Sequence, residues 1–123
     1  MTDTIESLFD DWNGALQTRD PDRVAALYAD DAILLPTLSN QVRRDRTAIV
    51  NYFVGFLKKQ PRGVLTQSNV RVFGEIAINS GLYVFTLTDG GVASEAPCRF
   101  TFVYRREGDG WKIIEHHSSQ MPE

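Results

Sequence analysis

The chain has 123 residues, of which 42% are hydrophobic and 24% are charged, and its formal net charge is −3. This length and composition predict one soluble domain over residues 1–123 and argue against a disordered chain. The acidic balance argues against nucleic acid or an anionic membrane as a partner, and no apolar run approaches the roughly 20 residues that cross a bilayer. The acidic N-terminus is unlike a signal peptide, and the single cysteine cannot form an internal disulfide, so we expect a cytoplasmic protein.

The chain begins with a pattern typical of an amphipathic helix. Apolar residues recur with a 3.6-residue period from Ile5 to Leu16, and Trp12 lies at the middle of this stripe. Asp3 followed by Glu6 resembles a capping box. The sequence therefore predicts a first helix that begins near Asp3 and packs Trp12 into the core.

Two more helices and a short strand are predicted in the first half of the chain. Asp20 can cap a short second helix in which Pro21 takes the first position, and the two aspartates at residues 30–31 should end it. Residues 32–35 are predicted to form a short buried strand. After a polar loop, a third helix is expected over about 47–59.

From residue 64 onward the pattern indicates strands separated by turns rich in glycine and aspartate. The expected strands cover residues 64–73, 76–88, 92–106 and 111–118. Short turns of this kind join consecutive antiparallel strands, so the segments predict a meander. Helices grouped before a meander predict an α+β fold, with three helices packed on one face of a curved antiparallel sheet.

The two histidines, His116 and His117, are adjacent in a predicted strand. Neighbouring side chains on a strand point to opposite faces, so the pair cannot chelate one metal ion. Glu115 shares a face with His117, but two ligands fall short of a zinc site, and we expect no metal. His116 is predicted to share its face with Ile114 and Ser118, which leaves open a role in a pocket or a plain structural one.

A row of large side chains shares one face of the predicted strand 92–106. Its members are Cys98, Phe100, Phe102 and Tyr104. Such a row is typical of a core or of a pocket wall. The hydroxyls of Tyr83 and Tyr104 need hydrogen-bond partners when they are buried, so a partly polar pocket and a plain core both remain open.

One basic cluster precedes the third predicted helix, where Arg43, Arg44 and Arg46 surround Asp45. Backbone N–H groups at a helix N-terminus also favour anions. Arg43 could therefore hold a carboxylate or contact a neighbouring subunit, whereas a solvated loop with Asp45 as the helix cap is the simpler alternative for the other two arginines. No phosphate-binding loop or other cofactor motif occurs, so no cofactor is expected.

Several segments resemble the association domain of calcium/calmodulin-dependent protein kinase II, which also has free-standing bacterial homologues. They are residues 8–10, 20–21, 27–32, 35–40, 102–106, 111–114, 117–119 and Pro122. The earlier segments are shared by the wider nuclear transport factor-like superfamily, which includes SnoaL-like and ketosteroid isomerase-like proteins. The resemblance implies a cone-shaped, cystatin-like fold with a pocket at its opening and an outer sheet face that builds oligomers. It implies no kinase activity, since the chain lacks the kinase motifs.

The resemblance also indicates candidate ligand-binding residues. The kinase domains line their pocket with arginines at positions that align with Tyr83, Phe102 and Ser118, none of which is arginine here. The expected pocket is therefore mainly aromatic and suited to a flat or aromatic small molecule. Its candidate lining is Tyr83, Phe102, Tyr104, His116 and Ser118, with Arg43 supplying positive charge.

A second copy of the chain is the expected partner. The predicted strands carry apolar residues on both faces: Phe102 and Tyr104 lie on one face and Thr101 and Val103 on the outward face, with Val84 and Ile114 in neighbouring strands. Helices can cover only one face of the sheet, and monomers rarely expose a large apolar patch, so we expect a two-fold dimer or a larger homo-oligomer. Arg99 and Arg105 flank these positions and could pair with acidic residues of the other copy.

The sequence leaves two functions open. One is an association-type homo-oligomer that has a small-molecule pocket and no chemistry of its own. The alternative is a small SnoaL-like or ketosteroid isomerase-like enzyme that acts on a hydrophobic or aromatic substrate, with His116 as the base and Tyr83 or Tyr104 as the hydrogen-bond donor. A pocket-facing His116 within ~3.2 Å of the acidic proton of a bound ligand would favour catalysis, whereas an outward His116 in a subunit contact would favour association.

Overall fold

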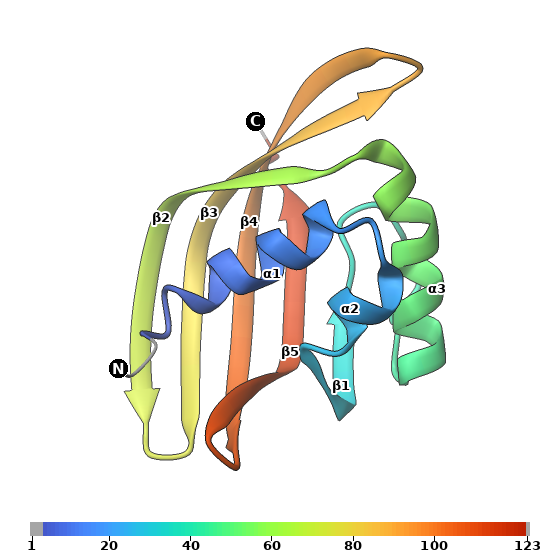
Figure 1. Ribbon diagram of the computed structural model, residues 1–123. Helices are drawn as coiled ribbons and strands as arrows, with labels where there is room; N and C mark the ends of the chain where they lie inside the picture. The colour runs from blue at the N-terminus through green and yellow to red at the C-terminus, as the bar shows by residue number, and fades with distance from the viewer. Residues whose placement is uncertain (1–3, 123) are drawn as a thin grey trace.

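The described part of the chain, residues 4–122 of a computed structural model, holds three α-helices and a five-stranded sheet (Figure 1). The elements are α1 (Leu8–Gln17), α2 (Pro21–Ala25), β1 (Tyr28–Leu35), α3 (Arg46–Phe56) with a 3-10 turn at Leu57–Lys59, β2 (Arg62–Phe73), β3 (Ile76–Asp89), β4 (Val92–Glu107) and β5 (Gly110–Gln120). The predicted α+β class is confirmed.

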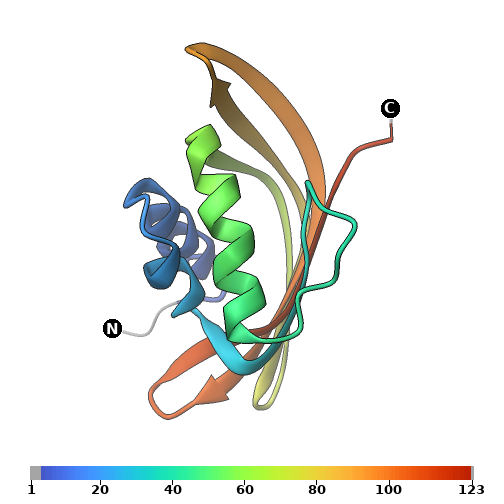
Figure 2. The same cartoon turned by 90° about the vertical axis from the view of Figure 1, so that its right-hand side faces the viewer.

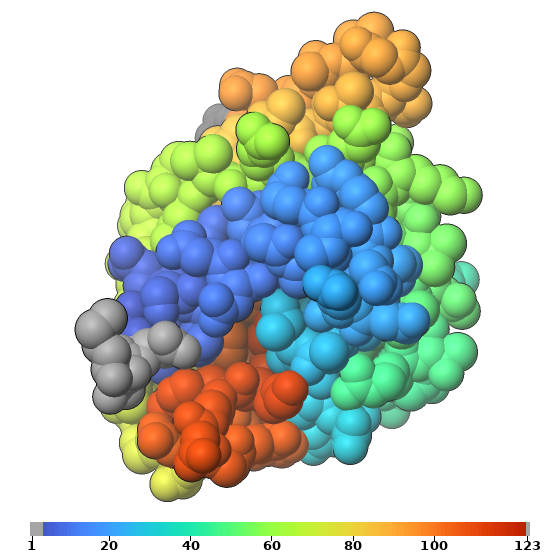
Figure 3. Space-filling view, viewed as in Figure 1, coloured from blue at the N-terminus to red at the C-terminus, as the bar shows by residue number. Residues whose placement is uncertain are grey.

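The sheet has the strand order β1-β5-β4-β3-β2. Strands β2 to β5 form the predicted antiparallel meander, but β1 pairs with β5 in parallel, with Leu34 opposite His116. The sheet is therefore not wholly antiparallel. Strands β1 and β5 are far apart in the sequence, and no hairpin turn joins them that would make them run antiparallel. All three helices lie on the same side of the curved sheet (Figure 2), and α1 and α2 cover its middle (Figure 3).

Helix α1 begins later than the sequence predicts. Asp3 lies outside the described residues, and the helix starts at Leu8 after an irregular turn. In that turn the Thr4 hydroxyl accepts a hydrogen bond from the backbone N–H of Ser7 at 3.1 Å. The predicted burial of Trp12 is confirmed, since its side chain is only 2% exposed.

The two aspartates expected to end the second helix lie instead within β1. Helix α2 already ends at Ala25, and Asp30 and Asp31 are exposed where the pairing of β1 with β5 is irregular. Asp30 pairs with Arg46 at 3.0 Å, and Arg105 donates to both oxygens of Asp31, at 2.8 and 3.1 Å. An irregular strand tolerates these residues because their carboxylates reach partners on other elements.

The predicted caps of the later helices are confirmed. Asp20 accepts from the backbone N–H of Asp22 at 3.0 Å, and Asp45 accepts from that of Ala48 at 2.8 Å. The helix predicted over 47–59 is present, but its last turn tightens into a 3-10 turn, which is common at helix ends.

A β-bulge in β5 changes the predicted face of one residue. The pairing with β4 jumps from Glu115 to Ile113, which leaves Ile114 as the extra residue. Ile113 is 2% exposed and joins the core, whereas Ile114 is partly exposed. The prediction that Ile114 shares a face with His116 is wrong, because strict alternation does not continue through a bulge.

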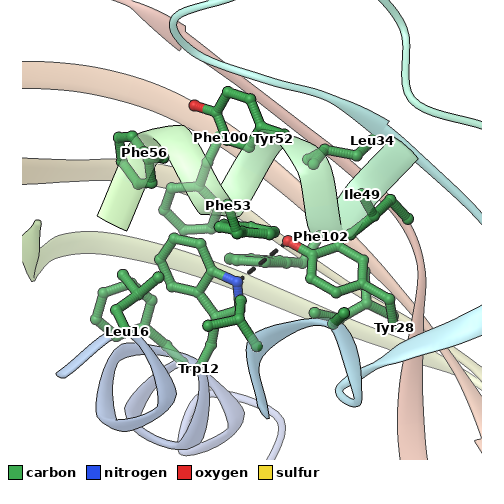
Figure 4. Close-up of a cluster of buried hydrophobic side chains, with 14 of the residues drawn as sticks. Trp12, Leu16, Tyr28, Leu34, Ile49, Tyr52, Phe53, Phe56, Phe100 and Phe102 are labelled. Atoms are coloured by element: carbon green, nitrogen blue, oxygen red, sulfur yellow. Dashed lines mark hydrogen bonds between the residues drawn. The ribbon is translucent and has the colours of Figure 1, made fainter. Parts of the chain in front are cut away.

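The aromatic face predicted for β4 forms one wall of the core. Cys98, Phe100, Phe102 and Tyr104 are all buried. The Trp12 ring of α1 lies against this wall, with its centroid 5.5 Å from that of Phe102 (Figure 4). The concave face of the sheet therefore closes over α1, as the cone-shaped fold requires.

Candidate functional site

The polar centre of the core is a row of hydrogen-bonded side chains that begins on α1. Trp12 Nε1–H donates to the Tyr28 hydroxyl at 3.1 Å (Figure 4), and that hydroxyl lies 2.8 Å from His116 Nδ1. An indole N–H can only donate, so the Tyr28 oxygen accepts from it. Among the described residues His116 Nδ1 is the one acceptor within reach of the Tyr28 hydrogen, which assigns that hydrogen to Nδ1. The imidazole is then neutral, with its hydrogen on Nε2.

The row continues from the imidazole to β3 and to the loop after β1. His116 Nε2 lies 3.2 Å from the Tyr83 hydroxyl, which therefore accepts from the ring N–H and donates to Ser118 Oγ at 2.6 Å. The Thr37 hydroxyl also donates to Ser118 Oγ, at 2.5 Å. The fold thus gathers hydroxyls and one imidazole from segments that are distant in the sequence.

Burial keeps the ionisable members of this row uncharged. It lowers the pKa of His116 to about 3, and the neighbouring His117 acts in the same direction. It also raises the pKa of Tyr28 and of Tyr83 well above the usual value. The imidazole stacks on Phe102, with the ring centroids 4.0 Å apart. At neutral pH the row is therefore an uncharged hydrogen-bonding cluster.

The row borders a small internal space, the inner cavity, of about 10 Å³, which has room for about one water molecule. It is lined by Trp12, Leu34, Pro36, Thr37, Tyr52, Phe53, Phe56, Tyr83, Phe85, His116 and Ser118. None of these lining residues is Asp, Glu, Lys or Arg. In this conformation the inner cavity is too small for an organic ligand.

A larger open groove, the outer groove, of about 380 Å³ shares Tyr52 and Phe56 with the inner cavity. It is lined by Leu38, Ser39, Arg43, Asn51, Tyr52, Gly55, Phe56 and Lys59. The rings of Tyr52 and Phe56 stack with their centroids 5.4 Å apart. The Tyr52 hydroxyl points away from the Trp12–Tyr28 pair (Figure 4), and burial raises its pKa to about 12. Tyr52 and Phe56 therefore line both the uncharged inner cavity and the outer groove, which also contains Arg43 and Lys59.

The structure brings together half of the predicted site residues and separates the rest. Phe102 packs behind the imidazole, and Tyr104 lines neither the inner cavity nor the outer groove. The Tyr104 hydroxyl is buried without a hydrogen-bond partner among the described residues. Arg43 lies in the outer groove. The candidates that meet at the inner cavity are Tyr83, His116 and Ser118.

Four residues at these two sites were not among the predicted site residues, namely Trp12, Tyr28, Thr37 and Tyr52. The rule that a buried tyrosine hydroxyl needs a partner applies to Tyr28 and Tyr52 as it does to Tyr83, and could have found both. Trp12 carries the same kind of polar group on an apolar ring. Thr37 lies in a loop, and nothing in its sequence context points to Ser118.

The side chain of His116 faces inward and is 2% exposed, so it is not part of the surface of the molecule. Both of its ring nitrogens are already hydrogen-bonded within the chain. Within residues 4–122, no three side chains of His, Cys, Asp or Glu gather as metal ligands. None of the described helices is both long and apolar enough to cross a membrane.

The sequence of this chain matches that of a known protein family. The sequence profile of the calcium/calmodulin dependent protein kinase II association domain matches residues 2–122. The chain belongs to this family. A search of curated proteins gives no match.

Solved structures place the association domain among related folds. A Xanthomonas campestris protein proposed to be an association domain of this kind is 50% identical, with a TM-score of 0.95 over 97% of this chain and 86% of its own. A Thiobacillus denitrificans protein proposed to be of the same kind is 24% identical, with a TM-score of 0.74 over 98% of both chains. A nuclear transport factor 2-like protein with a cystatin-like fold from Novosphingobium aromaticivorans is 15% identical, with a TM-score of 0.80 over 96% of this chain and 80% of its own. The expected nuclear transport factor-like, cystatin-like fold is confirmed.

Proposed function

We propose that this chain is a homo-oligomeric association-type domain that holds a small molecule and has no kinase activity of its own. The observation that carries the proposal is the outer face of the sheet, which the described helices leave uncovered (Figure 2). On this face Ile78 of β3 lies opposite Val103 of β4, and both are partly exposed, as is Val84. A second copy is the simplest cover for such an apolar face, and membership of the association-domain family supports this reading.

Arg99 and Arg105, which lie beside this face, are not equally free to pair with acidic residues of a second copy. Arg105 already donates to Asp31 and Glu107 within the chain, so it is less suited to pair with another copy than the sequence suggests. Arg99 is exposed on the same face, beside the exposed His117. We therefore favour Arg99 as the residue that fixes the register between copies.

The assembly is tested by light scattering at micromolar concentration. The wild type should have a mass that is a multiple of 13.9 kDa, and Val103→Glu should shift it toward the monomer, because a charge would be buried in the interface. Val54→Glu is the matched control, since Val54 is exposed on α3 and away from the sheet. A wild-type mass near 13.9 kDa would contradict self-association, and an intact Val103→Glu oligomer would move the interface elsewhere.

The buried row offers no free general base, which favours binding over catalysis. A general base needs a free nitrogen within hydrogen-bond reach of the substrate proton. Here Tyr28 donates to His116 Nδ1, and the hydrogen on Nε2 is directed to Tyr83. The isomerase-like alternative would require His116 to release Tyr28 first. The outer groove, whose Tyr52 and Phe56 rings also line the inner cavity, has room for a small molecule, whereas the inner cavity has not.

A further inference from the structure

We propose that the outer face of the sheet binds an inorganic oxyanion of the phosphate or sulfate class, in an open depression on β4 and β5. This outer depression has a volume of about 210 Å³ and is lined by Arg99, Phe100, Thr101, His117 and Ser119. It shares no residue with the inner cavity or the outer groove. The inference rests on the proposed self-association and specifies what balances the charge of Arg99 there.

The register of the strands brings four side chains around one point of the sheet. Arg99 of β4 lies opposite Ser119 of β5, and Thr101 lies opposite His117. Side chains that are directly opposite on paired strands have Cβ atoms about 4.5–5.5 Å apart. Phe100, between the two β4 residues, is buried in the core, and neighbouring residues of a strand point to opposite faces. All four side chains therefore point away from the helices, which cover the other face (Figure 2).

The sizes of these side chains shape the outer depression. The long side chains of Arg99 and His117 lie on one diagonal of the four, and the short ones of Thr101 and Ser119 lie on the other. The long side chains thus form walls, and the two hydroxyls lie between them. A guanidinium only donates hydrogen bonds, a hydroxyl donates one, and an imidazole carries an N–H in either charge state. A tetrahedral oxyanion, which accepts hydrogen bonds from several directions, is suited to this arrangement of donors.

Arg99 has its positive charge available for such a ligand. It is exposed, and within residues 4–122 it forms no ion pair. Arg105 of the same strand, by contrast, already donates to Asp31 and Glu107. The one carboxylate of β5, that of Glu115, is not part of the lining, and no other lining residue is acidic. An anion in the outer depression would therefore meet an uncompensated guanidinium.

Self-association makes this charge costly unless it is balanced. In a two-fold contact both copies use the same surface, so the outer depression of each copy would be covered together with Arg99. Covering a charge without a counter-charge is strongly unfavourable. A bound oxyanion supplies the counter-charge and accepts hydrogen bonds from the hydroxyls as well. We therefore expect the anion to strengthen self-association, because a ligand stabilises the state that binds it more tightly.

Dilution in two buffers of equal ionic strength, sodium phosphate and sodium chloride, tests this coupling. Light scattering gives the protein concentration at which half of the oligomer dissociates, and for the wild type it should be at least about threefold lower in phosphate. Arg99→Gln should remove the difference between the buffers. Thr101→Val, which keeps the shape and loses the hydroxyl, should reduce it. Arg71→Gln is the matched control and should keep it, since Arg71 is also exposed, on β2 and opposite Ile78 of the same face.

Two further comparisons identify the source of the negative charge. O-phosphoserine should strengthen self-association less than inorganic phosphate does, because the second copy covers the space that the attached organic group needs. An equal effect of both compounds would overturn the assignment to a free anion. The double variant Glu95→Gln/Glu115→Gln removes two exposed carboxylates of β4 and β5 and should associate as the wild type does. Weaker association of this variant, with no effect of phosphate on the wild type, would assign the counter-charge to the second copy instead.

Nuclear magnetic resonance locates the anion independently of the mass. Phosphate added to isotopically labelled wild type should shift the backbone amide signals of residues 99–101 and 117–119, and should leave that of Arg71 in place. Such shifts in a chain that stays a monomer would retain the anion site and contradict self-association. An oligomer that shows no such shifts, and that dissociates at the same concentration in both buffers, would overturn the anion site and leave the assembly intact.

Discussion

Trp12→Ala should lower the free energy of unfolding by about 3–5 kcal/mol, a large part of the stability of a domain of this size. The indole is 2% exposed, and its ring centroid lies 5.3 Å from that of His116 and 5.5 Å from that of Phe102. Truncation would open a cavity between α1 and the sheet and remove the N–H that donates to Tyr28. Urea unfolding followed by circular dichroism measures the effect.

The other tryptophan provides a matched control. Trp111 is partly exposed on β5, and its ring lies 5.4 Å from the Arg106 guanidinium carbon, so Trp111→Ala should cost about 1 kcal/mol or less. Trp12→Phe should cost less than Trp12→Ala, because it retains an aromatic ring while it removes the N–H donor and the remainder of the indole. If the unfolding midpoint of Trp12→Ala equals that of the wild type, α1 does not contribute to the core.

Stability should fall as the pH drops below about 6.5, and the cause should be His116. Burial lowers the pKa of this side chain from 6.5 to about 3 in the folded protein. Between these values the unfolded chain binds more protons than the folded chain, so acidification favours unfolding. The contribution of the neutral imidazole is complete above pH 6.5 and is lost toward pH 3. From pH 6.5 to pH 5 the loss should be about 2 kcal/mol.

Two histidine variants test this pH dependence through urea unfolding at pH 7 and pH 5. His116→Gln removes the titrating group and should flatten the dependence over this interval, although it lowers stability at pH 7. His117→Gln should retain most of the wild-type dependence, because it leaves the buried imidazole in place and removes only the smaller of the two causes that lower the pKa of His116. An equal loss of stability on acidification in wild type and His116→Gln would show that other groups cause it.

Local features were sufficient to predict most of the strands. Gly74 and Gly108 adopt positive φ angles of 64° and 62°, and glycine takes such turn conformations without strain. The turns therefore fixed the ends of the strands to within about two residues. The bulge at Ile114 and the parallel pairing of β1 depend on partners elsewhere in the fold, and no local pattern encodes them.

The candidate site was predicted only in part for the same reason. Alternation along a strand placed His116 and Ser118 on one face, and the need of a buried hydroxyl for a partner singled out Tyr83. The bond from Trp12 to Tyr28 depends on how α1 crosses the sheet, which the helical period does not specify. The inner cavity has room for about one water molecule, and a space of this size depends on the exact packing of its lining side chains, which the sequence does not specify.

The donor-only indole at the start of the buried row has a consequence for proton movement. Trp12 cannot accept a hydrogen, and among the described residues His116 Nδ1 is the one acceptor left for the Tyr28 hydrogen. The orientation of the Tyr28 hydroxyl, the imidazole tautomer and the orientation of the Tyr83 hydroxyl follow from these two facts in turn. Reversing any one of them would leave two hydrogens facing each other or an acceptor facing an acceptor. The row therefore cannot conduct protons past its α1 end. A proton that arrived at Ser118 could not leave the row through the indole, because the indole nitrogen does not accept a hydrogen.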